Sequence, residues 1–308
     1  MNITALRDAH ERIRPHIHRT PVLTSATFDR ETGIEAFFKA EHLQKIGAFK
    51  ARGALNAILR LEADTAARGV VTHSSGNHGA AVAWAAARRG IPATVVMPHG
   101  ASRVKVDAVE SHGARVVRCA HGEREATAEA EVASTGGTLI HPYEHPDVIA
   151  GQGTATIELL EDVGPLDALV VPVGGGGLSS GSAIALAALA PATSLVGAEP
   201  ARADDAYESL GSGRLVPGRT DPDTIADGLR AGLGPTTFEI LRSAGPQIVR
   251  VEDADIVEAC RFHLLFMKQV VEPSGAVATA ALRSIAARMP GARVGVVLSG
   301  GNTDLGWL

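Results

Sequence analysis

The sequence predicts an α/β protein with mainly parallel sheets, and two observations carry that prediction. Short runs of β-branched and other apolar residues alternate along the chain with longer, alanine-rich amphipathic segments. The short runs are continuously apolar, which is typical of parallel strands buried on both faces. With 308 residues, 45% of them hydrophobic, the chain is long enough to bury a large core divided between two lobes.

The predicted strands and helices largely alternate along the chain. Strands are predicted where β-branched residues cluster, at residues 69–74, 93–97, 114–118, 167–173, 194–199, 246–251 and 293–299. Helices are predicted where apolar residues recur at helical spacing, at about 77–90, 102–112, 122–135, 147–162, 176–190, 253–268 and 274–288. Since no stretch has the composition of a linker, a boundary between lobes is sought in turns such as residues 141–147.

Composition argues against several classes of protein. A net charge of −5 with scattered arginines gives no support for nucleic-acid binding, so no such partner is expected. No run approaches the roughly 18 consecutive apolar residues of a membrane span, and the polar N-terminus lacks the apolar core of a secretory signal. A cytoplasmic protein without a membrane partner is therefore expected. Cys119 and Cys260 are too few for a disulfide framework and are interpreted as reduced packing residues.

Four consecutive glycines, Gly174, Gly175, Gly176 and Gly177, stand between a predicted strand and a predicted helix. Backbone N–H groups and the positive end of a helix dipole meet at such a junction and together bind anions, phosphate above all. The spacing is not that of a P-loop, since no Lys-Ser or Lys-Thr follows, nor that of a dinucleotide fingerprint in its usual place. The alternative is a tight strand-to-helix turn packed against a neighbour.

Lys50 is one of only five lysines and follows Phe49 at the predicted start of a helix. The positive potential at a helix N-terminus and desolvation by an apolar neighbour both favour a neutral amine. A neutral amine is a nucleophile able to form a Schiff base. The alternative is a solvated helix residue, which is the usual place of a lysine.

Four motifs together resemble the fold-type II pyridoxal-phosphate enzymes, and most closely their serine/threonine dehydratase and serine racemase branch. The motifs are AFKARGALN around Lys50, SSGNHG at 74–79, GGGG at 174–177 and LSGGNTD at 298–304, in the order and approximate spacing of that family. The resemblance extends from about residue 15 to the end of the sequence. It implies that the cofactor is pyridoxal 5′-phosphate.

The resemblance gives each motif a role toward this cofactor. Lys50 would carry it as a Schiff base, Phe49 would flank its ring, and the four glycines would hold its phosphate. Asn77 would donate a hydrogen bond to the phenolic oxygen, and Ser299 would meet the pyridine nitrogen. Because a hydroxyl can hydrogen-bond to a neutral ring nitrogen, Ser299 favours loss of a leaving group from the β carbon over transamination.

The implied reaction is the dehydration of a β-hydroxy amino acid, L-threonine or L-serine, to a 2-oxo acid and ammonia. In it, Lys50 would remove the α proton. The small-molecule substrate would be held where a predicted strand meets a predicted helix, by Ser74, Ser75, Asn77, His78 and neighbouring backbone N–H groups. A capped helix entrance without a catalytic role is the alternative for this turn.

Ser75 keeps two further reactions open. Many threonine dehydratases have Ser-Ala-Gly-Asn-His at this turn, whereas serine racemases and 3-hydroxyaspartate dehydratases have Ser-Ser-Gly-Asn-His, as this chain does. A hydroxyl opposite Lys50 would exchange a proton on the other face of the cofactor, which racemisation requires. Serine racemase and 3-hydroxyaspartate dehydratase are therefore alternative functions. A non-catalytic module that binds a phosphate ligand is another, but such a module would need neither Lys50 nor Ser299.

The segment GAEPARADDAYES resembles the racemase cation site, in which Glu199, the carbonyl of Ala203 and Asp205 would bind the ion. All-oxygen ligands of this kind suit Mg²⁺, Ca²⁺ or Mn²⁺. Acidic residues at a strand end and a helix start, without an ion, are the alternative. His141 and His145 have the interval of a helical metal pair, but the adjacent prolines argue against a helix there.

The resemblance also implies a split architecture of two open, mainly parallel twisted sheets with helices on both faces. Residues 1–66 and 147–308 would form a large cofactor-binding domain, and residues 67–146 a small domain that moves to close the site. A homodimer is expected from the family alone. In the turn HPYEHP, His145 would favour an acidic substrate if it faced the site, and an exposed turn histidine is the alternative.

Overall fold

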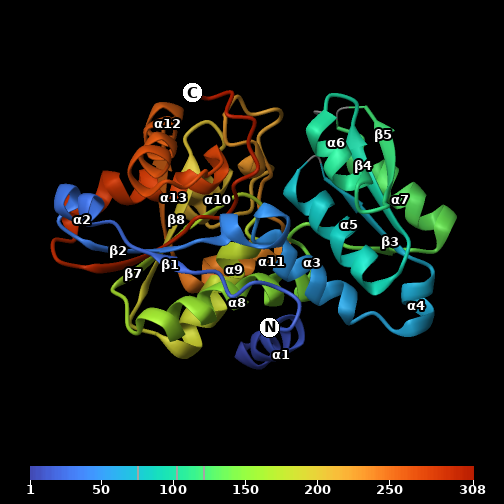
Figure 1. The fold of residues 1–308 in the computed structure, drawn as a ribbon, viewed down its shortest axis with the longest axis horizontal. Helices are drawn as coiled ribbons and strands as arrows, with labels where there is room; N and C mark the ends of the chain where they lie inside the picture. Colours follow the sequence, from blue (N-terminus) through green and yellow to red (C-terminus); the bar gives the residue numbers. More distant parts are fainter. Residues whose placement is uncertain (75, 102, 121) are drawn as a thin grey trace.

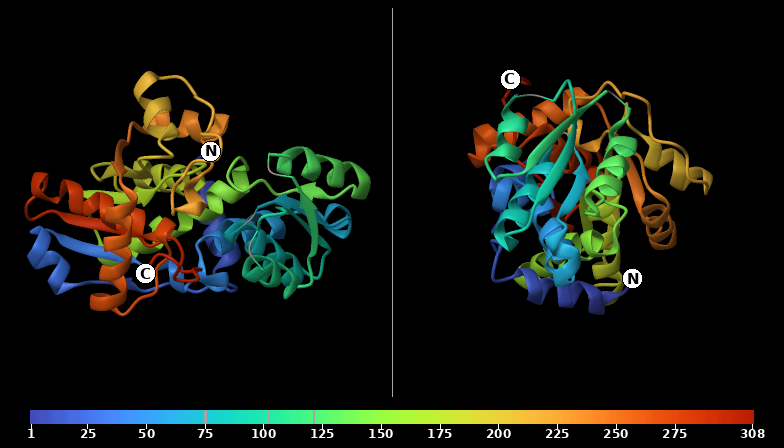
Figure 2. Two further views of the ribbon diagram at one scale, coloured as in Figure 1. Left: turned by 90° about the horizontal axis from the view of Figure 1, so that it is seen from above. Right: turned by 90° about the vertical axis from the view of Figure 1, so that its right-hand side faces the viewer.

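The computed structural model of the protein describes residues 1–74, 76–101, 103–120 and 122–308. The described residues build two sheets, of six and four strands, with helices on both faces (Figures 1 and 2). All strand pairs except one run parallel. The predicted fold class, an α/β protein with two mainly parallel sheets, is therefore confirmed.

The six-stranded sheet has the order β1-β2-β10-β7-β8-β9, in which only β1 and β2 are antiparallel. Its strands are β1 (Val22–Leu23), β2 (Glu35–Lys39), β7 (Ala168–Pro172), β8 (Ser194–Pro200), β9 (Gln247–Val251) and β10 (Arg293–Val297). Helices α8 (Pro146–Val163) and α9 (Gly177–Leu189) cover one face, and α12 (Asp253–Phe262) and α13 (Pro273–Ile285) cover the other (Figure 1).

Strand β7 shows why its sequence is a continuous apolar run. Leu169 and Val171 belong to the core cluster with residues of α8 and α9. Ala168 and Val170 belong to the cluster with residues of α12 and α13, on the opposite face. Because successive side chains of a strand point to opposite faces, burial of both faces leaves no position for polar residues.

The four-stranded sheet has the order β5-β4-β3-β6 and is entirely parallel. Its strands are β3 (Val70–His73), β4 (Ala93–Pro98), β5 (Arg115–Cys119) and β6 (Thr138–Leu139), with helices α5 (Asn77–Arg89), α6 (Arg103–Glu110) and α7 (Arg124–Thr135). These strands fall within residues 67–146, and the six strands of the other sheet fall outside that range. The domain bounds themselves stay a prediction.

Several elements carry no strong signal in the sequence. They are α1 (Ile3–Ile13), α2 (Ala26–Thr32), α4 (Ala63–Ala67), α10 (Asp205–Ser212), α11 (Pro235–Ala244), β1, β2 and β6, whereas the start of α3 (Lys50–Leu59) was predicted. Strand β2 was missed because its sequence, EAFFK, has only three apolar residues between charged ends. Its Lys39 is nevertheless fully buried, because Glu158 of α8 forms an ion pair with it at 2.8 Å.

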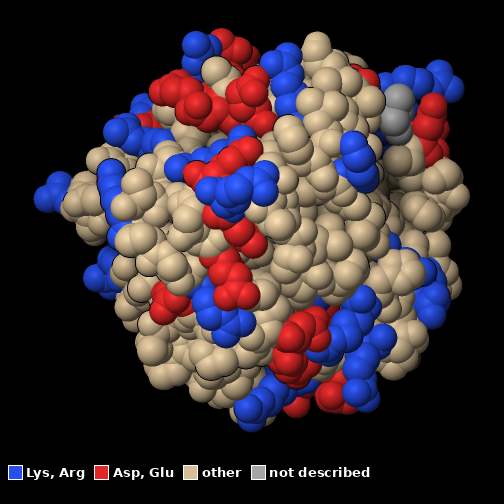
Figure 3. All heavy atoms as spheres, turned by 60° about the vertical axis from the view of Figure 1, so that its left-hand side comes forward, with Lys and Arg blue, Asp and Glu red and all other residues tan. Residues whose placement is uncertain are grey.

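Charged side chains of both signs share one face of the molecule. On the face drawn in Figure 3, lysine and arginine side chains are interspersed with aspartate and glutamate. Among the described residues, no helix combines the length and the apolar character needed to cross a membrane. Cys119 and Cys260 are both buried and unpaired with each other, as the sequence predicted.

Candidate active site

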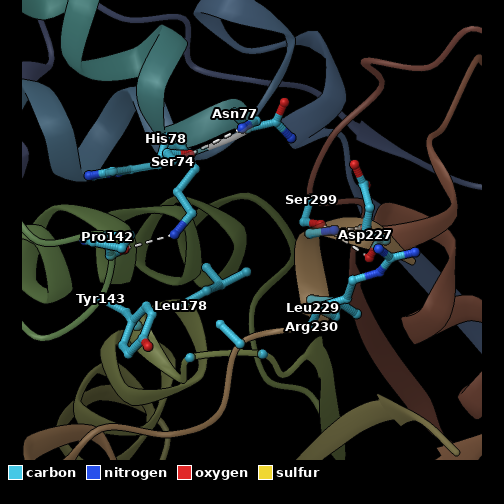
Figure 4. A pocket seen from close by; sticks show the side chains of 18 of the residues that line it. Ser74, Asn77, His78, Pro142, Tyr143, Leu178, Asp227, Leu229, Arg230 and Ser299 are labelled. Carbon is cyan, nitrogen blue, oxygen red and sulfur yellow. Dashed lines mark hydrogen bonds between the residues drawn. The ribbon is translucent and has the colours of Figure 1, made fainter. Parts of the chain in front are cut away.

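A pocket lies between the two sheets, at the carboxyl ends of strands from both (Figure 4). Ser74 follows β3, Gly174 follows β7 and Ser299 follows β10, and all three line the pocket. The carboxyl edge of parallel strands is where α/β proteins bind their ligands. The predicted site residues that line this pocket are Phe49, Lys50, Ser74, Asn77, His78, Gly174, Gly175, Gly176, Gly177 and Ser299.

Lys50 is the first residue of α3, as the sequence predicted. Its Nζ atom donates a 2.8 Å hydrogen bond to the carbonyl oxygen of Pro142 and lies 5.1 Å from the centroid of the Phe49 ring (Figure 4). Burial lowers the pKa of Lys50 from 10.5 to about 8. The amine is therefore neutral in a much larger fraction of molecules at neutral pH than a solvated lysine, which suits a nucleophile or a base.

Arg52, two residues after Lys50, anchors the first turn of α3 in the protein interior. Its guanidinium donates to both carboxylate oxygens of Glu41 at 2.7 and 2.8 Å and to both of Glu158 at 2.8 and 2.7 Å. Lys39 completes a group of two cations and two carboxylates, all at most 2% exposed. Because each buried charge has an opposite partner, the start of α3 has one favoured position.

The four glycines form the turn into α9, and each faces a close neighbour. Gly176 adopts a left-handed conformation, with φ of 85°, which favours glycine. A Cβ atom at Gly175 would overlap the ring of Tyr143, and one at Gly174 would lie 3.0 Å from the Cα atom of Leu229. The loop therefore has bare backbone at the positive end of α9, and that backbone lines the pocket, as a phosphate cradle requires.

Ser299 and Asn77 line the same pocket as the glycine loop (Figure 4). Ser299 is buried, and its hydroxyl has only a long hydrogen bond, 3.4 Å, to the carbonyl of Ser274. The amide of Asn77 donates to Glu272 at 2.7 Å and accepts from Asn302 at 2.9 Å, so its orientation is fixed from two sides. Because its hydrogen bond to the Ser274 carbonyl is long, the Ser299 hydroxyl is available to a ring nitrogen.

Glu272 is a pocket residue that the sequence analysis missed. It is 5% exposed, and burial, with a smaller contribution from Asp227, raises its pKa from 4.5 to about 8. A carboxyl group that stays protonated at neutral pH is unusual and marks a functional site. No local motif distinguishes this glutamate in the sequence, because its burial and its contact with Asn77, at the start of α5, come from segments distant in the chain.

Ser74 and Gly76 belong to the turn before α5, where the sequence predicts an anion site. The Ser74 hydroxyl accepts a hydrogen bond from the backbone N–H of Gly76, which precedes the first residue of α5. The Nε2 atom of His78 lies 3.0 Å from the carbonyl of Ile140 and therefore donates to it. The Nε2–H group of His78 is therefore hydrogen-bonded to the backbone and is not directed at a substrate. Ser75 lies outside the described residues.

The predicted cation ligands lie together but away from the pocket. Both carboxylate oxygens of Glu199 accept hydrogen bonds at the start of α10, from the N–H groups of Ala206 at 2.9 Å and Tyr207 at 3.0 Å. Burial raises the pKa of Glu199 to about 8 and that of Asp205 to about 6. The buried Oδ1 atom of Asp205 has no hydrogen-bond partner among the described residues. Ala203, two residues earlier in the chain, is fully buried. Two destabilised carboxylates with a free oxygen fit a divalent cation.

A second group of potential ligands was not predicted. The ligand atoms of His73, Glu125 and His141 lie within 4.8 Å of one another. His73 and Glu125 also line the pocket. In the sequence, His141 has the interval of a helical pair with His145, which the adjacent prolines argue against, and the fold instead brings it near His73 and Glu125.

Glu144 and His145, in the turn after β6, serve as helix caps. Glu144 accepts hydrogen bonds from the backbone N–H groups of Thr236 at 3.1 Å and Thr237 at 2.9 Å, in the first turn of α11. His145 accepts one from Asp147 at 3.2 Å and caps α8. The proposed effect of His145 on an acidic substrate therefore finds no support in its position, since it does not line the pocket.

Comparison with known proteins agrees with this geometry. Residues 13–300 match the family described as pyridoxal-phosphate dependent enzymes. The chain is 48% identical to a serine racemase of Arabidopsis thaliana over 316 residues, covering 100% of this chain and 95% of the relative. It is 46% identical to a beta-hydroxyaspartate dehydratase of Paracoccus denitrificans over 299 residues, covering 96% and 95%. The solved structure of the T.th. threonine deaminase superposes with a TM-score of 0.94, at 45% identity over 99% of each chain. The chain therefore belongs to the pyridoxal-phosphate dependent enzymes, in the fold-type II branch that its motifs predicted.

Proposed function

We propose that this enzyme removes water and then ammonia from a β-hydroxy amino acid and yields a 2-oxo acid. The observation that carries the proposal is the half-buried amine of Lys50, with its pKa lowered to about 8, in a pocket that also presents a bare glycine loop and a serine hydroxyl with only a long hydrogen bond. The family match and the dehydratase and deaminase among its relatives support this choice.

The residues present fit pyridoxal phosphate. The backbone of the glycine loop would hold the phosphate, Lys50 would hold the aldehyde carbon, and Asn77 and Ser299 would hold the two polar atoms of the ring. When bound, the cofactor supplies an electron sink that acidifies the α proton of the amino acid. Ser299, a hydroxyl with a high pKa, would leave the ring nitrogen unprotonated, which would favour prompt loss of the β substituent.

The chain's own residues move the proton. The amine of Lys50 takes the α proton, for which a pKa of about 8 is close to the working pH. That proton and the β hydroxyl together account for one molecule of water. The released enamine then reacts with water to give the 2-oxo acid and ammonia, so no oxidant or reductant is needed. The α-carboxylate of the substrate would lie at the start of α5, held by Ser74, Ser75 and the backbone N–H groups of Asn77 and His78.

The test separates binding of the cofactor from turnover. Purified protein should be yellow with pyridoxal phosphate, and borohydride reduction should fix the cofactor to the peptide that contains Lys50. Lys50→Ala should lose turnover by about a thousandfold or more, because both the covalent anchor and the base are removed. Lys45→Ala, a matched control five residues away, should keep both. Colourless protein that cannot be reconstituted would instead support a module that only binds a phosphate ligand.

Serine racemase is the second candidate, and the 48% identity to the Arabidopsis enzyme favours it. Racemisation needs a proton donor on the face opposite Lys50, the role that the sequence predicts for Ser75. Incubation with L-serine, followed by measurement of 2-oxo acid and of the chirality of the remaining serine, distinguishes the two. Faster exchange of enantiomers than release of 2-oxo acid would make racemisation the main reaction.

A divalent cation and a homodimer complete the proposal. Glu199, the carbonyl of Ala203 and Asp205 would hold Mg²⁺, Ca²⁺ or Mn²⁺, since a cation would offset the burial of both carboxylates. Exposed apolar side chains near α12 suit a contact between copies, with Leu265 and Phe266 each 59% exposed. Light scattering after size-exclusion chromatography should give twice the mass of the 31.8 kDa chain.

A further inference from the structure

We infer that Asn302 is a positioning residue, which turns the Asn77 amide so that an N–H group, and not the carbonyl oxygen, faces the place of the cofactor's phenolic oxygen. The inference rests on the proposed function and adds a residue to the same site. Asn77 is among the described residues that line the pocket and Asn302 is not, so Asn302 acts through Asn77. Asn302 lies in the segment after β10, and Asn77 is the first residue of α5.

A backbone carbonyl group fixes the orientation of the Asn302 amide. The Nδ2 atom of Asn302 donates hydrogen bonds to the carbonyl oxygen of Ile46 at 2.7 Å and to the Oδ1 atom of Asn77 at 2.9 Å. The two ends of an amide side chain have nearly the same shape, so their hydrogen-bond partners tell them apart. Because a backbone carbonyl only accepts, the nitrogen of Asn302 must face Ile46. The second N–H group of the same nitrogen then faces Asn77.

This N–H group decides which end of the Asn77 amide is directed at Asn302. The atom of Asn77 that meets a donor must be its oxygen, so its nitrogen points the other way, where it donates to Oε1 of Glu272 at 2.7 Å. An amide nitrogen carries two protons, and the described part of the chain gives the second proton of Asn77 no partner. That second N–H group is the one that would meet the phenolic oxygen of the cofactor.

Backbone hydrogen bonds hold Asn302 in place relative to the start of α3. The backbone N–H group of Phe49 donates to the carbonyl oxygen of Ser299 at 3.0 Å. The backbone N–H group of Gly301 donates in the opposite direction, to the carbonyl oxygen of Gly47 at 2.9 Å. Asn302 follows directly, and its side chain joins this paired backbone to the start of α5. The groups expected to hold the cofactor's aldehyde carbon, phenolic oxygen and ring nitrogen therefore belong to one hydrogen-bonded unit.

The backbone before Lys50 is shaped around the Asn302 side chain. Ile46, whose carbonyl accepts from Asn302, has a φ of 59°, a left-handed conformation that is rare for a β-branched residue. Gly47 also has a positive φ, of 70°, and a Cβ atom there would lie 2.5 Å from the Oδ1 atom of Asn302. Strained backbone persists only where its surroundings hold it. The Asn302 amide is therefore confined between this backbone and Asn77.

The test changes the polarity of Asn302 but not its shape. Asn302→Asp puts an acceptor where two oxygens need a donor, so the Asn77 amide should turn over and present its oxygen to the cofactor. A hydrogen bond to the ionised phenolic oxygen favours the ionised form, which absorbs in the visible range, and its loss favours the protonated form, which absorbs in the ultraviolet. At saturating pyridoxal phosphate and neutral pH, the ratio of visible to ultraviolet absorbance should fall by about tenfold, the effect of losing one hydrogen bond to a charged oxygen.

Further variants separate positioning from folding and from strain. Asn302→Ala adds no charge and should lower the same ratio by about two- to tenfold, so it decides the question if the aspartate variant does not fold. Gly47→Ala displaces the amide of Asn302 without changing its chemistry and should act in the same direction. Gly33→Ala, at a glycine with φ of 72° where an added Cβ meets no atom, is the matched control for strain. Asn2→Asp, at the start of α1, is the matched control for the added charge. Both controls should keep the wild-type ratio.

The absorbance readings need no turnover. A wild-type ratio in both folded Asn302 variants would overturn the positioning role and leave the proposed function intact. Weaker binding of pyridoxal phosphate with an unchanged ratio would show that Asn302 only stabilises its own segment, and would also overturn the inference. No 2-oxo acid from wild-type enzyme would overturn the proposed function, whereas the absorbance ratios would still decide the role of Asn302.

Discussion

Gly175 lies directly under the ring of Tyr143, so that a Cβ atom at position 175 would overlap the ring carbons. The glycine loop is therefore shaped by protein packing as well as by the phosphate it would hold. Tyr143 also contacts His141 edge to face, so one tyrosine packs against both the glycine loop and that histidine. Burial raises the pKa of Tyr143 to about 12, so the ring stays neutral beside the site for an anion.

This contact predicts that Gly175→Ala will weaken cofactor binding. Forcing a methyl group against the ring costs about 1–3 kcal/mol, which corresponds to roughly 5- to 150-fold in affinity. Tyr143→Ala should restore part of the affinity in the double variant, which a double-mutant cycle would show as a coupling between the two sites. Titration with pyridoxal phosphate, followed by visible absorbance, measures both. Gly211→Ala in α10, where an added Cβ meets no atom, is the control and should bind as the wild type does.

The strands that end at the pocket were predicted well from the sequence. They are parallel and buried on both faces, so each is a continuous apolar run in the sequence. It also predicted that Lys50 starts a helix and that the glycines start another. Residues that acquire their environment from distant segments could not be found in this way. Glu272 and His141 have no local motif. The fold brings Asn77 next to Glu272 and His73 next to His141.

The pKa of Glu272 predicts how stability depends on pH. The carboxyl titrates near 4.5 when unfolded and near 8 when folded. Between these values this carboxyl holds its proton in the folded state and loses it in the unfolded state, so its contribution to the free energy of unfolding falls as the pH rises from about 4.5 to about 8. The slope from one such group is on the order of 1 kcal/mol per pH unit.

Glu272→Gln removes this titration. The variant should match the wild type near pH 5 and be more stable than the wild type at pH 8 and above, in urea denaturation of the cofactor-free and metal-free protein. Glu199 has the same raised pKa, so Glu199→Gln should flatten the profile further in the double variant. A difference in free energy of unfolding between Glu272→Gln and the wild type that stays constant from pH 5 to pH 8 would contradict the assignment.

The cation site predicts a stabilisation by Mg²⁺. A cation at about 100 times its Kd stabilises the folded state by about 2.7 kcal/mol, or roughly 5 °C in Tm for a chain of this size. Thermal melts with magnesium chloride and with EDTA measure this shift. Glu199→Gln and Asp205→Asn should abolish it. Asp223→Asn, an acidic side chain that is 92% exposed on a nearby segment, should keep it. An equal shift in all three variants would mean that magnesium acts elsewhere.

The buried group of Lys39, Glu41, Arg52 and Glu158 predicts a large loss of stability when it is divided. Arg52→Met leaves two carboxylates buried without the guanidinium that donates to both, which costs about 3–5 kcal/mol. Adding Glu41→Gln should recover most of this loss, because Lys39 still pairs with Glu158 at 2.8 Å and no net charge is left inside.

Urea denaturation measures these losses, and a surface pair gives the control. Arg60→Met removes the ion pair with Asp147, in which the arginine is 51% exposed, and should cost at most about 1 kcal/mol. Since Arg52 fixes the first turn of α3, Arg52→Met should also shift the visible absorbance of the cofactor at Lys50, and the double variant should restore it. A double variant as unstable as Arg52→Met would show that shape, and not charge balance, holds the start of α3.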